Sequence, residues 1–319
     1  FEQESEALCY FEIRSKAKVG DGKITVNVQG GGSKSFEIIN LKVRVPNVAT
    51  HVTKKGIANQ EKDYEESLAP FGLEGTEKLA VEISKFPSFR LTERLEYLIR
   101  YPHGCVEQTT SSVFPQLFLE TFTEINESQK ENIKKNVIAG IERLKTFQTS
   151  DGGLAYWPGN STSDEWGSNY AGHFIVEAKL KGFHVPETFF NNWLGYQTSK
   201  ANNWRIDLRD NGHRSSSAQT QVYRLYLLAL AGKGNIGAMN RFRALDELPA
   251  EVKWRLANAY QLMGFNDVAQ NLTKGLSITL QENKYRYYNY GSDLRDLSMI
   301  LESAALAKEW TKAQSLFET

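Results

Sequence analysis

The 319-residue sequence has few cysteines, no net charge and no long apolar segment. Its 38 basic side chains balance 38 acidic ones, whereas proteins that bind nucleic acid or acidic membrane surfaces usually carry basic patches. No apolar run approaches the ~20 residues that a membrane-spanning helix needs. Two cysteines, Cys9 and Cys105, supply neither a disulfide framework nor a metal site. We therefore predict no nucleic-acid partner, no membrane insertion, no metal and no cofactor.

The ends of the sequence indicate part of a longer protein. It begins at Phe1 rather than at a methionine, it ends within a segment of helical periodicity, and nothing in it resembles a secretory signal. We expect the chain to be a fragment, so the lack of a signal does not define its compartment. The length predicts about two domains of ~150 residues each.

Residues 1–88 have the two-residue periodicity of β-strands. Apolar and polar residues alternate over 24–29 and again over 39–45, which predicts strands with one apolar face. Cys9 lies among apolar neighbours and is predicted to be a buried strand residue. The expected turns are at Asp21-Gly22 and 30–32, and further strands are expected around 51–55 and 78–84.

From residue 89 the apolar period becomes helical. Short connections predict antiparallel neighbours, and Pro115 predicts a kink or a split in the helix that contains it. The expected helices span 91–101, 106–124, 129–148, 165–181, 187–199, 215–231, 237–246, 250–263, 265–277, 292–307 and 309–318.

The functional interpretation depends on Cys105, which precedes Gln108 by three residues at a predicted helix start. The thiolate could attack the glutamine side-chain carbonyl, release ammonia and leave an internal thioester. Unpaired N–H groups and the positive end of the helix dipole would favour the thiolate, and Gly104 would let the backbone fold tightly. The alternative is a buried free cysteine beside an unrelated glutamine, which a bare Cys-x-x-Gln spacing would favour.

The surrounding residues change this balance. Gly-Cys-Val-Glu-Gln-Thr-Thr at 104–110, preceded by Arg-Tyr-Pro, resembles the thioester motif of the alpha-2-macroglobulin family, especially its bacterial members. Vertebrate members carry Gly-Cys-Gly-Glu-Gln, so Val106 departs from the pattern at a position whose side chain does no chemistry. The resemblance continues at 156–159, 170–174 and 290–296 and covers most of the chain.

The resemblance implies a single-use covalent endopeptidase inhibitor of bacterial host defence rather than an enzyme. A protease would cut a bait region, absent from this chain, and expose the Cys105–Gln108 thioester. A nucleophile on the protease, by preference a lysine amine, would then become bound to Gln108. The implied partners are proteases and other domains of the same polypeptide. The implied location is the periplasm or cell envelope, with lipid anchoring of the full-length protein.

Four neighbours are predicted to support the thioester pair, namely Tyr101, His103, Gly104 and Glu107. In family members that favour hydroxyl acceptors, a downstream histidine attacks the thioester first. His213 lies at a suitable separation, although a solvated loop histidine is the competing interpretation because Asn211-Gly212 precedes it.

The resemblance also divides the chain into a multidomain α+β fold. Residues 1–47 would end a macroglobulin-type β-domain with an antiparallel β-sandwich, and 48–88 would form the first half of a CUB-like β-domain. Residues 89–319 would form an all-α α/α toroid that contains the thioester.

Two other functions remain open. The first is an α/α toroid enzyme, either a hydrolase that uses Cys105 or a cyclase-like catalyst; a hydrolase would need a histidine within hydrogen-bond reach of the thiol. The second is a helical interaction scaffold in which Cys105 is inert, which predicts an unmodified thiol.

Overall fold

The structure is a computed structural model, and the chain divides into two compact units, Phe1–Lys85 and Phe86–Thr319. The described residues are 8–14, 19–44, 50–54, 56, 58, 63–69, 71–72, 77–81, 83, 95, 97–205, 214–245, 248–278 and 292–317.

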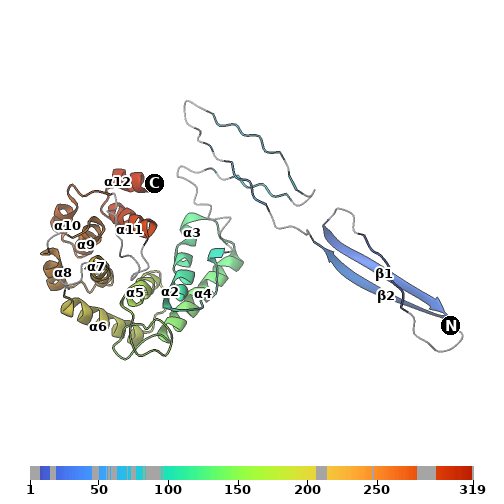
Figure 1. Cartoon of the computed structure of the whole chain (residues 1–319), viewed down its shortest axis with the longest axis horizontal. Coiled ribbons are helices and arrows are strands. Elements are labelled where there is room, and N and C mark those ends of the chain that lie inside the picture. Colours follow the sequence, from blue (N-terminus) through green and yellow to red (C-terminus); the bar gives the residue numbers. More distant parts are fainter. Residues whose placement is uncertain are drawn as a thin grey trace. The chain divides into compact units, whose positions relative to one another are not determined.

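The first unit contains an antiparallel hairpin of β1 (Gly20–Gly30) and β2 (Ser33–Val43) (Figure 1). Ile24 pairs with Ile39 in its register. The two strands are joined at Gly31 and Gly32, which both have positive φ. A two-residue hairpin turn with positive φ at both central positions favours glycine, because glycine has no Cβ to clash there.

Two predictions for this unit are wrong. Asp21-Gly22 is not a turn but part of β1, because the consecutive glycines further along the chain supply a turn without a steric cost. Cys9 is exposed and its backbone is irregular rather than buried in a strand.

The strands expected around 51–55 and 78–84 are not formed in the described residues of these segments. Leu79, Val81 and Ile83 alternate as predicted, but their side chains are exposed. A strand needs a second strand to pair its N–H and C=O groups, and the described residues give these segments no such partner. The CUB-like assignment of 48–88 and the assignment of 1–47 to a macroglobulin-type domain stay predictions.

The second unit is mostly helical, as the periodicity predicts. In the described part of this unit the elements are α2 (Val106–Val113), η1 (Pro115–Leu117), α3 (Leu119–Phe122), α4 (Glu127–Lys145), α5 (Glu165–Leu180), α6 (Glu187–Asn203), α7 (Arg214–Leu230), α8 (Ile236–Arg243), α9 (Ala250–Leu262), α10 (Asn266–Thr273), α11 (Asp293–Leu306) and α12 (Trp310–Phe317).

The helix expected over 106–124 is split into α2, the 3₁₀ turn η1 and α3, which confirms the predicted effect of Pro115. Proline has no N–H to donate to the carbonyl four residues earlier, and its ring clashes with that turn. The α-helix therefore ends at Val113, and Pro115 occupies the first position of η1.

The helices form two layers (Figure 1). Helices α2, α5, α7, α9 and α11 each contact the next along an inner layer. The alternate helices α4, α6, α8, α10 and α12 pack outside them. The larger of two apolar clusters in this unit includes Val222, Leu225, Leu227 and Leu228 of α7, which are fully buried. A smaller, separate cluster joins Trp254 of α9 to Ile300 and Ala304 of α11 and to Ala313 and Leu316 of α12.

Helices α2 and α4 approach closely because of one glycine. Gly140 of α4 lies against Val113 of α2, and a Cβ at residue 140 would lie 2.9 Å from the nearest Val113 methyl carbon. Real Cβ atoms essentially never come so close to another heavy atom. This contact brings the last turns of α4 beside the beginning of α2.

Candidate functional site

Cys105 and Gln108 contact each other at the first turn of α2. Cys105 is the N-cap residue and has extended backbone, with φ −71° and ψ 177°. Its Sγ accepts a hydrogen bond from the backbone N–H of Gln108 at 3.5 Å. In return, Gln108 Oε1 accepts one from the backbone N–H of Cys105 at 3.1 Å. This capping box satisfies N–H groups that a helix start leaves unpaired.

The two reacting groups differ in exposure. Cys105 is only 2% exposed, whereas Gln108 is an exposed residue. The thiol is therefore covered by protein while the glutamine remains accessible. Reciprocal bonds also hold the side-chain carbonyl of Gln108 on the same side of the turn as the thiol.

Gly104 gives the glutamine side chain its position. Its φ is +84°, a left-handed conformation that favours glycine. A Cβ on Gly104 would overlap Oε1 of Gln108. The predicted need for a glycine before Cys105 thus has two physical causes, the backbone conformation and the space that the glutamine occupies.

Arg143, near the end of α4, holds the segment before α2. Its Nη2 donates to the carbonyl oxygen of Gly104 at 2.7 Å, and its Nε donates to Oγ1 of Thr109 at 3.1 Å. The hydroxyl of Thr109 in turn donates to the carbonyl of His103 at 3.3 Å. No local sequence signal marks Arg143 for this contact, because a basic residue in the last turn of a helix is ordinarily explained by the helix dipole.

Val106 fixes the other side of the helix start. Its backbone N–H donates to the carbonyl of Tyr156 at 3.1 Å. The Val106 side chain is fully buried and lies against Gly167 of α5. The departure from the vertebrate motif at this position therefore supplies apolar packing between α2 and α5.

Glu107 lies on the side of α2 that faces the beginning of α5. Burial raises the pKa of the Glu107 carboxyl above its usual value, and the negative charge of Asp164 raises it further. Asp164 is the N-cap of α5, where it accepts a hydrogen bond from the N–H of Gly167 at 2.5 Å. Burial raises the pKa of Asp164 as well, against the effect of this bond. Two partly desolvated carboxyl groups therefore interact beside the reactive pair.

A pocket of about 320 Å³ adjoins the start of α5. It is lined by Tyr156, Asp164 and the residues from Asn160 to Ser163. Asp164 thus belongs both to the pocket wall and to the start of α5.

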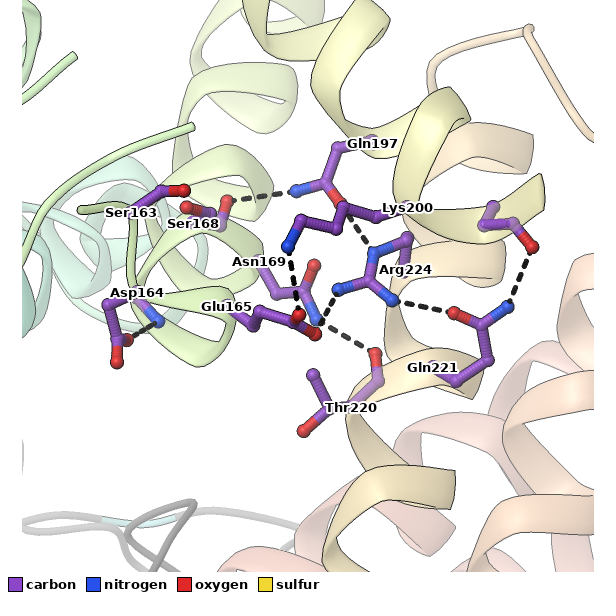
Figure 2. Close-up of polar contacts among 12 residues, drawn as sticks. Ser163, Asp164, Glu165, Ser168, Asn169, Gln197, Lys200, Thr220, Gln221 and Arg224 are labelled. Carbon is purple, nitrogen blue, oxygen red and sulfur yellow. Dashed lines mark hydrogen bonds and ion pairs between the residues drawn. The ribbon is translucent and has the colours of Figure 1, made fainter. Parts of the chain in front are cut away.

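A buried polar network fixes that start (Figure 2). Arg224 of α7 is fully buried and donates to Gln197, Gln221 and Glu165 at 3.0, 2.6 and 2.8 Å. Lys200 also donates to Glu165, at 3.2 Å. Burial would raise the pKa of Glu165, but the charges and hydrogen bonds of Arg224 and Lys200 lower it below its usual value. The network joins α5, α6 and α7 directly after Asp164.

A second cluster connects the end of α2 to α5 and α7. The ring of Phe114 meets the ring of His173 edge to face, with centroids 4.9 Å apart. Nδ1 of His173 lies 2.8 Å from the hydroxyl of Tyr223. Burial lowers the pKa of His173 to about 4, although the nearby charge of Glu302 acts in the opposite direction. The imidazole is therefore neutral at neutral pH.

The remaining predicted residues are placed differently. Tyr101 and His103 are exposed, and His213 lies outside the described residues. Within the described part of the chain, no histidine side chain is hydrogen-bonded to Cys105, and Cys105 is not in a disulfide. No group of three or more described His, Cys, Asp or Glu residues is placed to hold a metal ion. None of the described helices is both long and apolar enough to cross a membrane.

The second unit is thus a helical domain of two layers with a Cys–Gln capping pair at the start of an inner helix. Residues 79–195 match the A-macroglobulin TED domain. The chain therefore carries an A-macroglobulin TED domain and is similar to bacterial alpha-2-macroglobulins, the family that the motif resembles.

Two relatives show how much of such a protein the chain represents. It is 27% identical over 226 residues to alpha-2-macroglobulin of Rickettsia conorii, which is 66% of this chain and 12% of that protein. It is 26% identical over 318 residues to alpha-2-macroglobulin of Escherichia coli K12, which is 92% of this chain and 19% of that protein. The chain thus spans less than a fifth of the length of either relative.

Solved structures share the fold. Salmonella alpha-2-macroglobulin reacted with methylamine is 24% identical with a TM-score of 0.60, over 72% of this chain and 16% of that chain. Trypsin-activated alpha-2-macroglobulin from Escherichia coli is 24% identical with a TM-score of 0.58, over 68% of this chain and 15% of that chain.

Proposed function

We propose that this chain carries the thioester-forming domain of a protease-trapping inhibitor. The observation that carries the proposal is the reciprocal contact between Cys105 and Gln108. Each side chain bonds to the backbone of the other residue, so the thiol and the glutamine carbonyl lie within one helical turn. Such positioning turns an encounter of two groups into an intramolecular reaction.

The bond would form by acyl transfer. Sγ of Cys105 attacks Cδ of Gln108, the Cδ–Nε2 bond breaks, and nitrogen leaves as ammonia with the proton from the thiol. The burial of Cys105 would keep water from the sulfur.

In trapping, an amine nitrogen would be the nucleophile and the sulfur of Cys105 the leaving group. An amine nitrogen forms a bond to Cδ, the Cδ–Sγ bond breaks, and the sulfur leaves as a thiolate while the nitrogen gives up its proton. The product is a stable amide between Gln108 and the attacking protein. Each chain can react once, so the activity is that of an inhibitor rather than of an enzyme.

The partners that fit this chemistry are proteases that bring a lysine amine to an exposed Gln108. The related Escherichia coli protein is described in a trypsin-activated form and in one activated by porcine elastase. The periplasmic or envelope location stays a prediction.

Intact mass and thiol titration, before and after methylamine treatment, test the proposal. We expect a chain lighter than its sequence by one ammonia, which gains methylamine and releases one thiol at Cys105. Cys105→Ala should keep the mass that its sequence predicts and should not react.

The other outcomes distinguish the alternatives. A mass that matches the sequence, with Cys105 already reactive, would contradict the proposal and favour the inert scaffold. Conversion of Gln108 to glutamate would mean that the thioester formed and was lost to water. Repeated turnover of an acyl substrate that Cys105→Ala abolishes would instead support a hydrolase.

A further inference from the structure

We infer that Arg143 is a positioning residue for the acyl-transfer steps and acts on the reacting oxygen through one peptide group. This inference rests on the proposed function. It concerns the oxygen Oε1 of Gln108, which becomes negatively charged when sulfur or an amine adds to the neighbouring carbon.

One backbone hydrogen-bond donor contacts this oxygen. The backbone N–H of Cys105 donates to Oε1 at 3.1 Å. The next N–H along the chain, that of Val106, donates to the Tyr156 carbonyl instead, and that of Gln108 donates to Sγ. The Cys105 N–H therefore occupies the position of an oxyanion-stabilising donor, a role in which backbone N–H groups are effective because they are already oriented.

Arg143 contacts the other side of the peptide unit that carries this donor. The N–H of Cys105 and the C=O of Gly104 belong to the same planar peptide unit and point in opposite directions. Nη2 of Arg143 donates to that carbonyl oxygen at 2.7 Å. Arg143, the peptide unit and Oε1 thus form one continuous chain of hydrogen bonds. Hydrogen bonds in such chains polarise one another, so a cation on the carbonyl makes the N–H a stronger donor.

Two hydrogen bonds orient the guanidinium group of Arg143. Its Nε donates to Thr109 Oγ1 at 3.1 Å, so two bonds fix its plane. Arginine presents its donors in a rigid planar arrangement, whereas lysine has a single flexible ammonium group. Lysine at this position would keep the charge but could not reproduce both bonds in one geometry.

The experiment compares Arg143→Gln with Arg241→Gln in the full chain. Arg241 is a matched control, because it also lies near a helix end and donates to a backbone carbonyl, that of Asn202, away from the motif. The rate constant for thiol release by methylamine is measured together with the thermal unfolding midpoint. We expect Arg143→Gln to slow thiol release by roughly tenfold, less than the loss of a direct oxyanion donor. Arg143→Lys should restore part of the rate, and Arg241→Gln should leave it unchanged.

A second readout reports the hydrogen bond itself. The chain has only two cysteines, so labelling cysteine with ¹⁵N gives one amide signal for Cys105 and one for Cys9 as an internal reference. We expect the amide proton of Cys105 to move upfield in Arg143→Gln, as its hydrogen bond weakens, while that of Cys9 does not move. A residue that only stabilised the fold would change the unfolding midpoint without this shift.

The outcomes separate this inference from the proposed function. If the wild-type chain loses no ammonia and releases no thiol, the proposed function fails and the inference with it. If the wild type reacts but folded Arg143→Gln reacts at the same rate with an unchanged Cys105 signal, only the inference is overturned. If Arg143→Gln does not fold, Arg143→Lys carries the test. A wild-type rate and a wild-type Cys105 signal in that variant would overturn the inference.

Discussion

The side chain of Gln108 occupies the position that a Cβ on Gly104 would need, because such a Cβ would overlap Oε1 of Gln108. The φ of Gly104 is also positive, at +84°. We therefore predict that Gly104→Ala destabilises the chain by more than the ~1–2 kcal/mol cost of a left-handed alanine, and that it prevents the loss of ammonia. Chemical denaturation and intact mass measure the two effects.

Gly159→Ala is the matched control for that change. Gly159 has nearly the same backbone, with φ +83°, but a Cβ there would meet nothing within 4 Å. It should show the conformational cost alone and leave the mass unaffected. Equal destabilisation by the two substitutions, with ammonia still lost from Gly104→Ala, would contradict the role of this contact.

Arg224 stabilises the junction of α5, α6 and α7 (Figure 2). Arg224→Met should destabilise the chain by roughly 3 kcal/mol. It leaves Oε1 of Gln197 and of Gln221 without the donor that Arg224 supplies, and it removes the buried one of the two cations that pair with Glu165. The value is at the lower end for a broken buried pair, since the Glu165 side chain is 45% exposed. Urea denaturation measures the change.

Lys200→Met tests the same carboxylate from the solvent side. Lys200 is 40% exposed and bonds to the other oxygen of Glu165. The expected loss is below about 1 kcal/mol, as for other solvent-exposed ion pairs. A loss in Lys200→Met as large as that in Arg224→Met would show that burial does not decide the contribution.

His173 should make the stability of the helical unit depend on pH. Its pKa is about 4 in the folded chain and near 6.5 when unfolded, so the unfolded state binds more protons between these values. Stability is then fully present above about pH 6.5 and falls as pH decreases toward 4, by on the order of 3 kcal/mol from this group. Urea denaturation between pH 4 and 7 should show the fall, and His173→Gln should reduce it.

The exposed His184 provides the control for this experiment. His184→Gln should keep the acid-side loss of the wild type. Because Glu302, Glu177 and Arg255 lie near His173, the comparison uses differences between variants rather than one curve. The same slope in His173→Gln and in the wild type would contradict the prediction.

Asp164 should control the titration of Glu107. Asp164→Asn removes a negative charge but keeps an N-cap side chain of similar strength. We expect the pKa of Glu107 to fall toward its ordinary value, although burial will keep it raised. Carboxyl-carbon NMR titration measures it directly.

The sign of the effect on stability follows from the same shift. A carboxyl whose folded pKa is raised above the unfolded value holds its proton more tightly in the folded chain, so its contribution is lost as pH rises through the folded pKa. Asp164→Asn should make that loss smaller. Asp267→Asn, on the exposed side of α10, should leave the Glu107 titration as it is in the wild type.

Local sequence signals predicted the helical unit well. From residue 127 onward the apolar period placed helices close to their observed bounds, whereas the helix expected over 91–101 lies partly outside the described residues. The effect of Pro115 depends only on its own ring and missing N–H. The β-rich unit was predicted less well. Alternation in 78–83 is present, yet a strand also requires a partner, which no local pattern supplies.

The sequence by itself determined the contact between Cys105 and Gln108, because residues three apart at a helix start lie within one turn whatever surrounds them. Only the tertiary structure decided which groups act on that pair. Arg143 lies on α4, which packs close to α2 at Gly140. The carbonyl of Tyr156, in a loop, accepts the hydrogen bond of the Val106 N–H. Asp164 lies near Glu107 at the start of α5. These partners are distant in sequence, and their positions follow from how the helices pack rather than from any local preference of the chain.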